Sequence, residues 1–118
     1  MITSPQNPKI KRVRRLQDKS NFRDKEEAFV VEGVRLVEES LRHGWPPEMV
    51  FYTSELDKRG YQIVEQFRSL GVHVTQVSPE TMESASDTET PQGLLAVLPL
   101  KRRPQPQNQF TSIKSKSY

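Results

Sequence analysis

The stretch Phe29–Leu41, FVVEGVRLVEESL, contains the transition that decides the fold of this chain. The continuous apolar run Ala28–Val31 is typical of a strand that is buried on both faces. The apolar residues that follow recur at the spacing of one helical face: Val34, Val37 and Leu41, with Leu36 beside them. The sequence therefore predicts a strand that passes into a helix directly through Glu32-Gly33.

This Glu32-Gly33 turn has two interpretations. Tight strand-to-helix turns often hold phosphates or other anions at the helix N-terminus. Alternatively, Gly33 only gives the chain steric room to turn. The chain has neither a G-x-G-x-x-G nor a G-x-x-x-x-G-K-S/T pattern, so this turn is not expected to be a nucleotide-binding motif.

The alternation of strand and helix continues to residue 98. Further strands are predicted at Met49–Tyr52, Val72–Val77 and Gly93–Leu98. A helix with apolar residues Tyr61, Val64, Phe67 and Leu70 follows the capping-box pattern of residues 54–57 (SELD), and a short helix is expected from Ser78 to about Ala85. Alternating strands and helices are the signature of a layered α/β fold.

A basic helix is predicted ahead of the first strand. Asn7-Pro8 is a favourable helix start, because Asn caps free N–H groups and Pro suits the first helical position. One apolar stripe runs along this helix: Ile10, Val13 and Leu16. Its other faces carry five cations: Lys9, Lys11, Arg12, Arg14 and Arg15. Residues 18–27 are polar, and Phe22 is expected to anchor a second short helical turn.

The charge of the 118-residue chain is divided unevenly. Residues 1–27 carry eight Lys and Arg against four Asp and Glu, residues 28–98 carry five against eleven, and residues 99–118 carry five and no acid. Basic ends on an acidic body suggest contact with a polyanion, although solubility alone is the simpler explanation. No apolar run is long enough to span a membrane, and the basic start lacks the apolar core of a secretory signal. We therefore expect a cytoplasmic protein of one domain.

No catalytic or metal-binding constellation is predicted. The absence of cysteine excludes disulfides and thiolate chemistry. His43, at the end of a predicted helix, is more simply a partner of the helix dipole, and His73 is more simply a strand residue. We therefore expect no catalytic residue, no metal and no cofactor in this chain.

Three segments together resemble a known family: SPQNPKIKRVRRL at residues 4–16, FVVEGVRLVEESL at 29–41 and SDTETPQGLLAVL at 86–98. In this order they are similar to the N-terminal substrate-binding domain of the SpoU (TrmH) family of RNA ribose 2′-O-methyltransferases. The resemblance covers residues 2–98. It implies a three-layer α/β/α domain with a mixed four-stranded sheet of order 1-4-2-3, strand 4 being antiparallel, similar to kink-turn-binding ribosomal proteins.

The resemblance also implies a division of labour. A domain of this kind selects ribosomal or transfer RNA, and a following knotted domain binds S-adenosylmethionine and transfers the methyl group, usually in a homodimer. That catalytic domain has no counterpart here, so we expect an isolated domain or a truncated gene product. The expected regions are a basic helical segment at 1–27, the RNA-substrate-binding domain at 28–99 and a polar linker or disordered tail at 100–118.

The candidate RNA contacts follow from matching positions to the family pattern and from the cationic helix. They are Asn7, Lys9, Lys11, Arg12, Arg15, Glu32, Gly33, Arg35, Thr90, Gln92 and Gly93. Glu32 is expected either to orient Arg35 or to accept a hydrogen bond from a base edge. Two other functions stay open: a protein-interaction or dimerisation module, and a free-standing binder of structured RNA. The cationic helix favours RNA, because protein interfaces prefer aromatic residues and Met over lysines.

Overall fold

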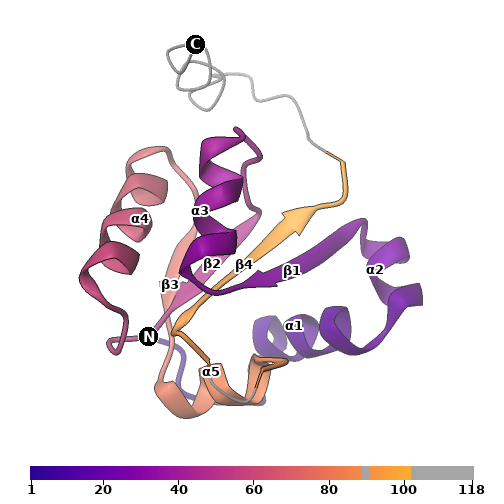
Figure 1. Cartoon of the computed structure of the whole chain (residues 1–118). Coiled ribbons are helices and arrows are strands. Elements are labelled where there is room, and N and C mark those ends of the chain that lie inside the picture. Colours follow the sequence, from indigo (N-terminus) through magenta and orange to yellow (C-terminus); the bar gives the residue numbers. More distant parts are fainter. Residues whose placement is uncertain (89–90, 102–118) are drawn as a thin grey trace.

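The computed structural model describes residues 1–88 and 91–101, which form five helices and one four-stranded sheet (Figure 1). The helices are α1 (Pro8–Asp18), α2 (Ser20–Glu26), α3 (Val34–Arg42), α4 (Lys58–Ser69) and α5 (Pro79–Ala85). The strands are β1 (Ala28–Glu32), β2 (Met49–Tyr52), β3 (Val74–Gln76) and β4 (Leu94–Pro99). The predicted alternation of strand and helix is confirmed.

The sheet has the order β1-β4-β2-β3 and is mixed. β4 runs antiparallel to both of its neighbours, whereas β2 and β3 are parallel. All six residues of β4 are buried, because this strand lies inside the sheet and is covered on both faces. The sheet order and the antiparallel fourth strand implied by the family resemblance are therefore confirmed.

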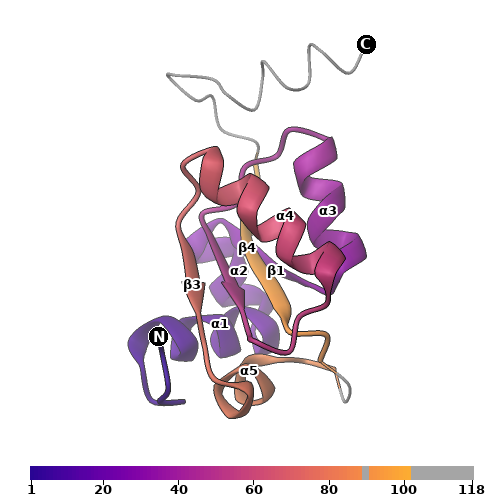
Figure 2. The ribbon, with the colours of Figure 1, turned by 90° about the vertical axis from the view of Figure 1, so that its left-hand side faces the viewer.

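Helices cover both faces of the sheet (Figure 2). The side chains of β4 contribute to the two cores in alternation. Leu94, Ala96 and Leu98 pack with α3 and α4. Leu95 and Val97 pack with α1 and α5 on the opposite face. This alternation follows from the period of two of a strand, which sends successive side chains to opposite faces.

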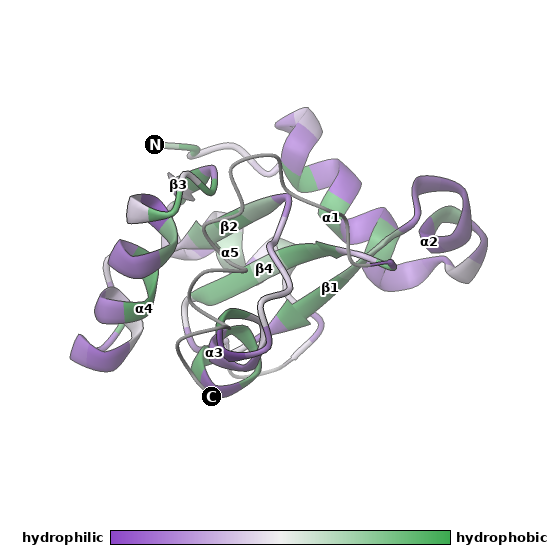
Figure 3. Cartoon of the chain, turned by 90° about the horizontal axis from the view of Figure 1, so that it is seen from above, coloured by the Kyte–Doolittle hydropathy of each residue, from purple (hydrophilic) through white to green (hydrophobic). Residues whose placement is uncertain are grey.

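The basic helix α1 is part of the domain. Asn7 caps it, with its Oδ1 accepting a hydrogen bond from Lys9 N at 2.9 Å. The predicted apolar stripe is fully inside the second core, where its members are at most 1% exposed: Ile10, Val13 and Leu16. Figure 3 shows the consequence, since α1 and α2 are largely hydrophilic on the outside of the molecule. The helix thus docks by one edge, as predicted.

The second short helix is also confirmed as α2, and no residue of it is buried. It is tied to α1 by Arg23, whose guanidinium donates to the carbonyls of Leu16 at 2.6 Å and Gln17 at 3.1 Å. These carbonyls belong to the last turn of α1, so Arg23 satisfies groups that a helix end leaves without partners. Phe22 packs against the second core, as the anchor that the sequence predicts.

The start of α4 differs from the prediction. Asp57, and not Ser54, caps this helix by accepting a hydrogen bond from Gly60 N at 2.7 Å. The buried face is Gly60, Ile63, Val64 and Phe67, whereas Tyr61 is 37% exposed. The reason is Leu56, which packs so closely on Gly60 that a Cβ at position 60 would overlap its side chain. The glycine therefore sets the face of the helix that turns inward.

Two smaller expectations are also corrected. β3 spans Val74–Gln76 and is shorter than the predicted strand, because Val72 N donates to Phe67 O at 3.0 Å and still belongs to the end of α4. Leu36, expected beside the inner face of α3, is 55% exposed. The predicted linker or tail from residue 102 onward lies outside the described residues. No helix among the described residues has both the length and the apolar character needed to cross a bilayer.

Candidate nucleic-acid interface

The Glu32-Gly33 turn and the segment before β4 form one interlocked unit. Gly33 has a φ of 93° and precedes α3 without offering a side-chain cap. Instead, the Oε1 atom of Gln92 accepts a hydrogen bond from Val34 N at 3.0 Å, and Gly33 N donates to Leu94 O at 2.9 Å. Gln92 thereby caps the N-terminus of α3 from a distant point in the sequence.

This cap also explains the glycine. A Cβ at position 33 would lie 2.9 Å from Gln92 Oε1, and the positive φ is one that residues with a side chain rarely adopt. The side chain of Gln92 occupies the place where an anion would bind at the N-terminus of α3. Of the two interpretations of the turn, steric room is supported by this geometry.

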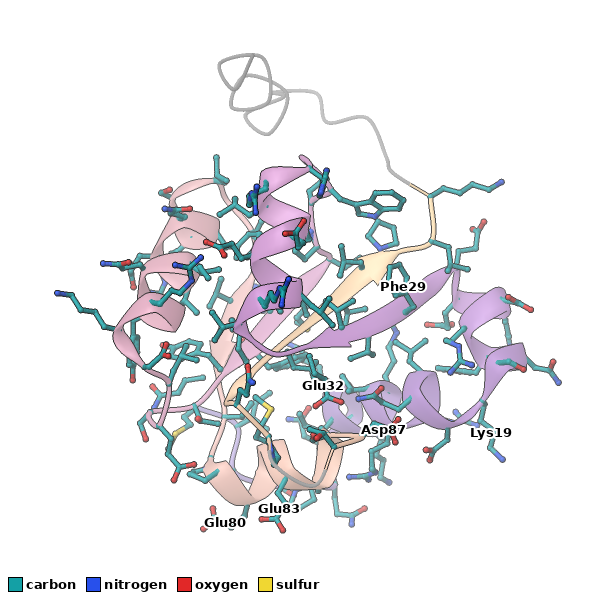
Figure 4. All side chains as sticks on the ribbon, viewed as in Figure 1. Lys19, Phe29, Glu32, Glu80, Glu83 and Asp87 are labelled. Atoms are coloured by element: carbon teal, nitrogen blue, oxygen red, sulfur yellow. The ribbon has the colours of Figure 1, made fainter. Side chains whose placement is uncertain are left out.

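Glu32 connects three elements from the end of β1. Its carboxylate accepts hydrogen bonds from Gln17 Nε2 of α1 at 2.8 Å, from Asp87 N at 2.7 Å and from the hydroxyl of Ser86. Figure 4 shows Glu32 and Asp87 close together between β1 and α5. Within the described ranges Glu32 makes no ion pair with Arg35, so the expectation that it orients Arg35 is wrong.

Arg35 projects into solvent from the first turn of α3. It forms no hydrogen bond or ion pair with any described residue, and it borders a surface hollow of about 710 Å³ between α3 and α4. The hollow has both signs of charge, and two of its cations are already paired, Arg59 with Glu38 and Arg42 with Glu39. Arg35 is therefore a free cation on a surface of mixed charge.

The four predicted cations of α1 separate into two groups. Lys9, Lys11 and Arg15 are exposed. Arg12 is half-buried and pairs with Glu26 of α2 at 2.8 Å and with Glu48 before β2 at 3.3 Å. Burial alone would lower the pKa of Arg12, but its hydrogen bond to Glu26 and the charge of Glu48 outweigh burial and raise that pKa. Arg12 is thus a clamp between elements.

The structure gathers only part of the predicted set. Glu32, Gly33, Arg35, Gln92 and Gly93 meet at the end of β1 and the start of β4, where Gly93 O accepts a hydrogen bond from Thr53 N at 3.0 Å. The cations of α1 lie over the opposite face of the sheet from α3. Asn7 uses its side chain as a cap. Thr90 lies outside the described residues.

Two features were not predicted as sites. A hollow of about 230 Å³ lies where α1 meets α2, lined by Arg15, Lys19, Asn21, Phe22 and Lys25. An apolar hollow of about 500 Å³ lies beside the edge strand β1 and includes Phe29, Val31, Leu36, Trp45 and Leu98. Neither is visible as a sequence pattern, because each joins residues of different elements. No group of three or more His, Asp or Glu among the described residues has a metal-binding arrangement.

Comparison with known proteins gives consistent matches. Residues 7–96 match the family of the MRM3-like substrate binding domain. An uncharacterised tRNA/rRNA methyltransferase from Synechocystis sp. is 28% identical over 97 residues, which are 82% of this chain and 35% of that protein. The chain therefore spans about a third of the length of this relative.

Two crystal structures show the same arrangement in longer proteins. An RNA 2′-O ribose methyltransferase is 28% identical with a TM-score of 0.72, covering 87% of this chain and 38% of that one. An AdoMet-bound rRNA methyltransferase from Sinorhizobium meliloti is 25% identical with a TM-score of 0.70, covering 87% of this chain and 37% of that one.

Proposed function

The chain belongs to the family of MRM3-like substrate-binding domains, found N-terminal in SpoU/TrmH RNA 2′-O-methyltransferases, and we infer that it selects ribosomal or transfer RNA for methylation by a catalytic domain. We propose that this RNA is structured, because the family resemblance implies a three-layer α/β/α domain similar to kink-turn-binding ribosomal proteins. A cytoplasmic location, where such RNA is found, is part of this proposal.

The observation that carries the proposal is a set of exposed cations on α1, on α2 and at the junction between them. They are Lys9, Lys11, Arg15, Lys19 and Lys25. None of them has an ion-pair partner among the described residues, in contrast to Arg12. An unpaired cation is free to neutralise a phosphate, and such contacts supply most of the non-specific affinity for nucleic acid.

The test is the salt dependence of RNA binding. If the five cations each neutralise one phosphate, log K should fall against log[salt] with a slope of roughly −3.5 for contacts to single-stranded segments and up to about −4.5 for contacts to double-stranded segments. A labelled structured RNA is titrated at low and moderate salt. A flat response, or no binding at low salt, would contradict the proposal.

A matched pair of variants localises the site. Replacing both Lys9 and Lys11 by Gln should reduce the salt slope by about one unit for each lost contact. Folding should be retained, since both side chains are exposed while the apolar stripe of α1 is untouched. Lys58→Gln, at the start of α4, is the control and should leave the slope unchanged.

Methyl transfer is proposed for another domain. Related longer methyltransferases bind AdoMet, the methyl donor of this chemistry. At the Glu32-Gly33 turn the Gln92 side chain already accepts the hydrogen bond of Val34 N, so we do not assign AdoMet binding to this turn. Calorimetry of the isolated chain with AdoMet should show no saturable heat, and a saturable signal would overturn this assignment.

A second candidate function is self-association. The observation in its favour is the apolar hollow beside β1. This strand is one of the two edge strands of the sheet, and exposed Leu36 lines the hollow. An edge strand next to an apolar surface is a template for pairing with a second copy of the chain. By family resemblance, the full-length protein is also proposed to be a homodimer. A free-standing binder of structured RNA is the remaining alternative, and it would give the same salt dependence in the RNA titrations.

A further inference from the structure

The hollow between α1 and α2 contains a cation–π pair of side chains. The guanidinium carbon of Arg15 lies 4.9 Å from the ring centroid of Phe22. Phe22 is held in place by its contact with the second core and by Arg23, which ties α2 to the last turn of α1. Arg15 is exposed, so its guanidinium lies over the ring and is also open to solvent.

The surroundings of this pair favour an anionic ligand. Lys19 and Lys25 line the same hollow together with Asn21, and none of the lining residues is acidic. Two acids of α2 flank Lys25 in the sequence: Glu26 is paired with Arg12, and Asp24 does not line the hollow. Figure 4 shows Lys19 projecting from the molecule at the junction of α1 and α2.

A planar cation supported from behind is suited to stacking. Unpaired bases of RNA stack on aromatic rings and on Arg guanidinium planes, whereas a base inside a duplex has both faces covered. Lysines on either side of such a platform suit the neighbouring phosphates, and a carboxamide offers both a donor and an acceptor to a base edge.

Resting on the proposed function, we propose that the Arg15–Phe22 platform binds one unpaired base of the RNA substrate. Lys19 and Lys25 contact the phosphates on its two sides, and Asn21 bonds to the edge of the base. The platform thus gives the domain a preference for RNA with a bulged or looped nucleotide, which phosphate contacts alone do not provide.

The molecule offers a natural control in a second Arg–aromatic pair. The guanidinium carbon of Arg68 on α4 lies 5.9 Å from the ring centroid of Tyr52. Arg68 is also paired with Glu65 and hydrogen-bonded to the hydroxyl of Tyr52. Its charge is therefore already compensated, and its stack should not bind RNA.

The experiment compares two RNA hairpins that are closed by a non-nucleotide linker and differ only in one bulged 2-aminopurine, so the second hairpin has no unpaired base. Arg15→Lys keeps the charge but loses the planar face, so affinity for the bulged hairpin should fall by roughly ten-fold, the scale of one stacked base. Affinity for the fully paired hairpin and the salt slope should not change. Phe22→Leu should reproduce the effect if circular dichroism shows it folded, and Arg68→Lys should bind both hairpins as wild type does.

The outcomes separate this inference from the proposed function. If wild type binds both hairpins equally, or Arg15→Lys weakens neither or both alike, Arg15 is only a phosphate contact and the platform is overturned while RNA binding stands. If wild type binds neither hairpin, the proposed function fails as well. A selective loss in Arg15→Lys supports the platform.

Discussion

At the scale of single residues, Gln92 explains why a glycine follows Glu32. Its carboxamide oxygen occupies the N-terminus of α3, where a side chain at position 33 would collide with it. The turn is thus held by two long-range hydrogen bonds, from Val34 N to Gln92 Oε1 and from Gly33 N to Leu94 O, and Glu32 adds three more to α1 and to the segment after α5.

Removing this cap should lower stability without unfolding the domain. Gln92→Ala is expected to cost about 1 kcal/mol of unfolding free energy, the usual value of a helix cap. Gly33→Ala should cost more, on the order of 1–3 kcal/mol, because the new side chain is strained at a φ of 93° and also displaces the cap. Thermal or urea unfolding measures both changes. Gln62→Ala on the exposed face of α4 is the control, and an equal loss there would refute the cap.

Arg35 should separate binding from folding. Because its side chain is exposed and makes no contact that stabilises the described fold, Arg35→Ala should leave the melting temperature nearly unchanged. If the end of β1 belongs to the RNA surface, the same variant should weaken RNA binding by about 1.5–3 kcal/mol, the value of a charged hydrogen bond. If Arg35→Ala binds RNA with the affinity of wild type, the RNA surface is limited to α1 and α2.

At the scale of elements, α1 combines a structural and an exposed set of cations. Arg12 joins α1 to α2 and to the chain before β2 through Glu26 and Glu48. Because the pKa of Arg12 is raised above an ordinary value that is already very high, its contribution is present below that value and persists at neutral pH.

Arg12→Gln should therefore reduce stability, by about 1 kcal/mol after allowance for solvent screening of these half-exposed ion pairs. Lys11→Gln, one position away and exposed, should change the unfolding free energy by no more than about 0.5 kcal/mol. Urea unfolding of the two variants at low and high salt is the measurement. Equal effects would mean that Arg12 is not a clamp.

At the scale of the whole molecule, the described domain has two distinct outer surfaces. The face covered by α1 and α2, whose ribbons are mainly hydrophilic in Figure 3, presents the free cations. The edge at β1 has the apolar hollow beside α3. One surface suits RNA and the other suits a protein, so the two candidate functions do not compete for the same residues.

Self-association through the edge of β1 predicts a concentration-dependent dimer. Leu36→Lys places a charge beside the apolar hollow and should shift sedimentation toward the monomer, while RNA affinity per chain stays unchanged. Lys58→Gln serves again as the surface control. A wild-type chain that remains monomeric at high concentration would remove this candidate.

Local sequence patterns correctly predicted the order of helices and strands, the cap at Asn7 and the buried stripe of α1. These features depend on neighbouring residues, because periodicity and capping act within a few positions of the chain. Sequence reasoning failed on the start of α4. Asp57 rather than Ser54 caps the helix, and the buried face includes Gly60, on which Leu56 packs.

Which side chains are free to bind a ligand depends on contacts between elements that are distant in the sequence. Gln92 and Val34 are separated by 58 positions, Glu32 and Asp87 by 55, and Arg12 and Glu48 by 36, so no local pattern reveals these bonds. The same is true of Arg15 and Phe22, which belong to different helices. A cation in the sequence is a candidate contact, but whether it is paired depends on which elements the fold brings beside it.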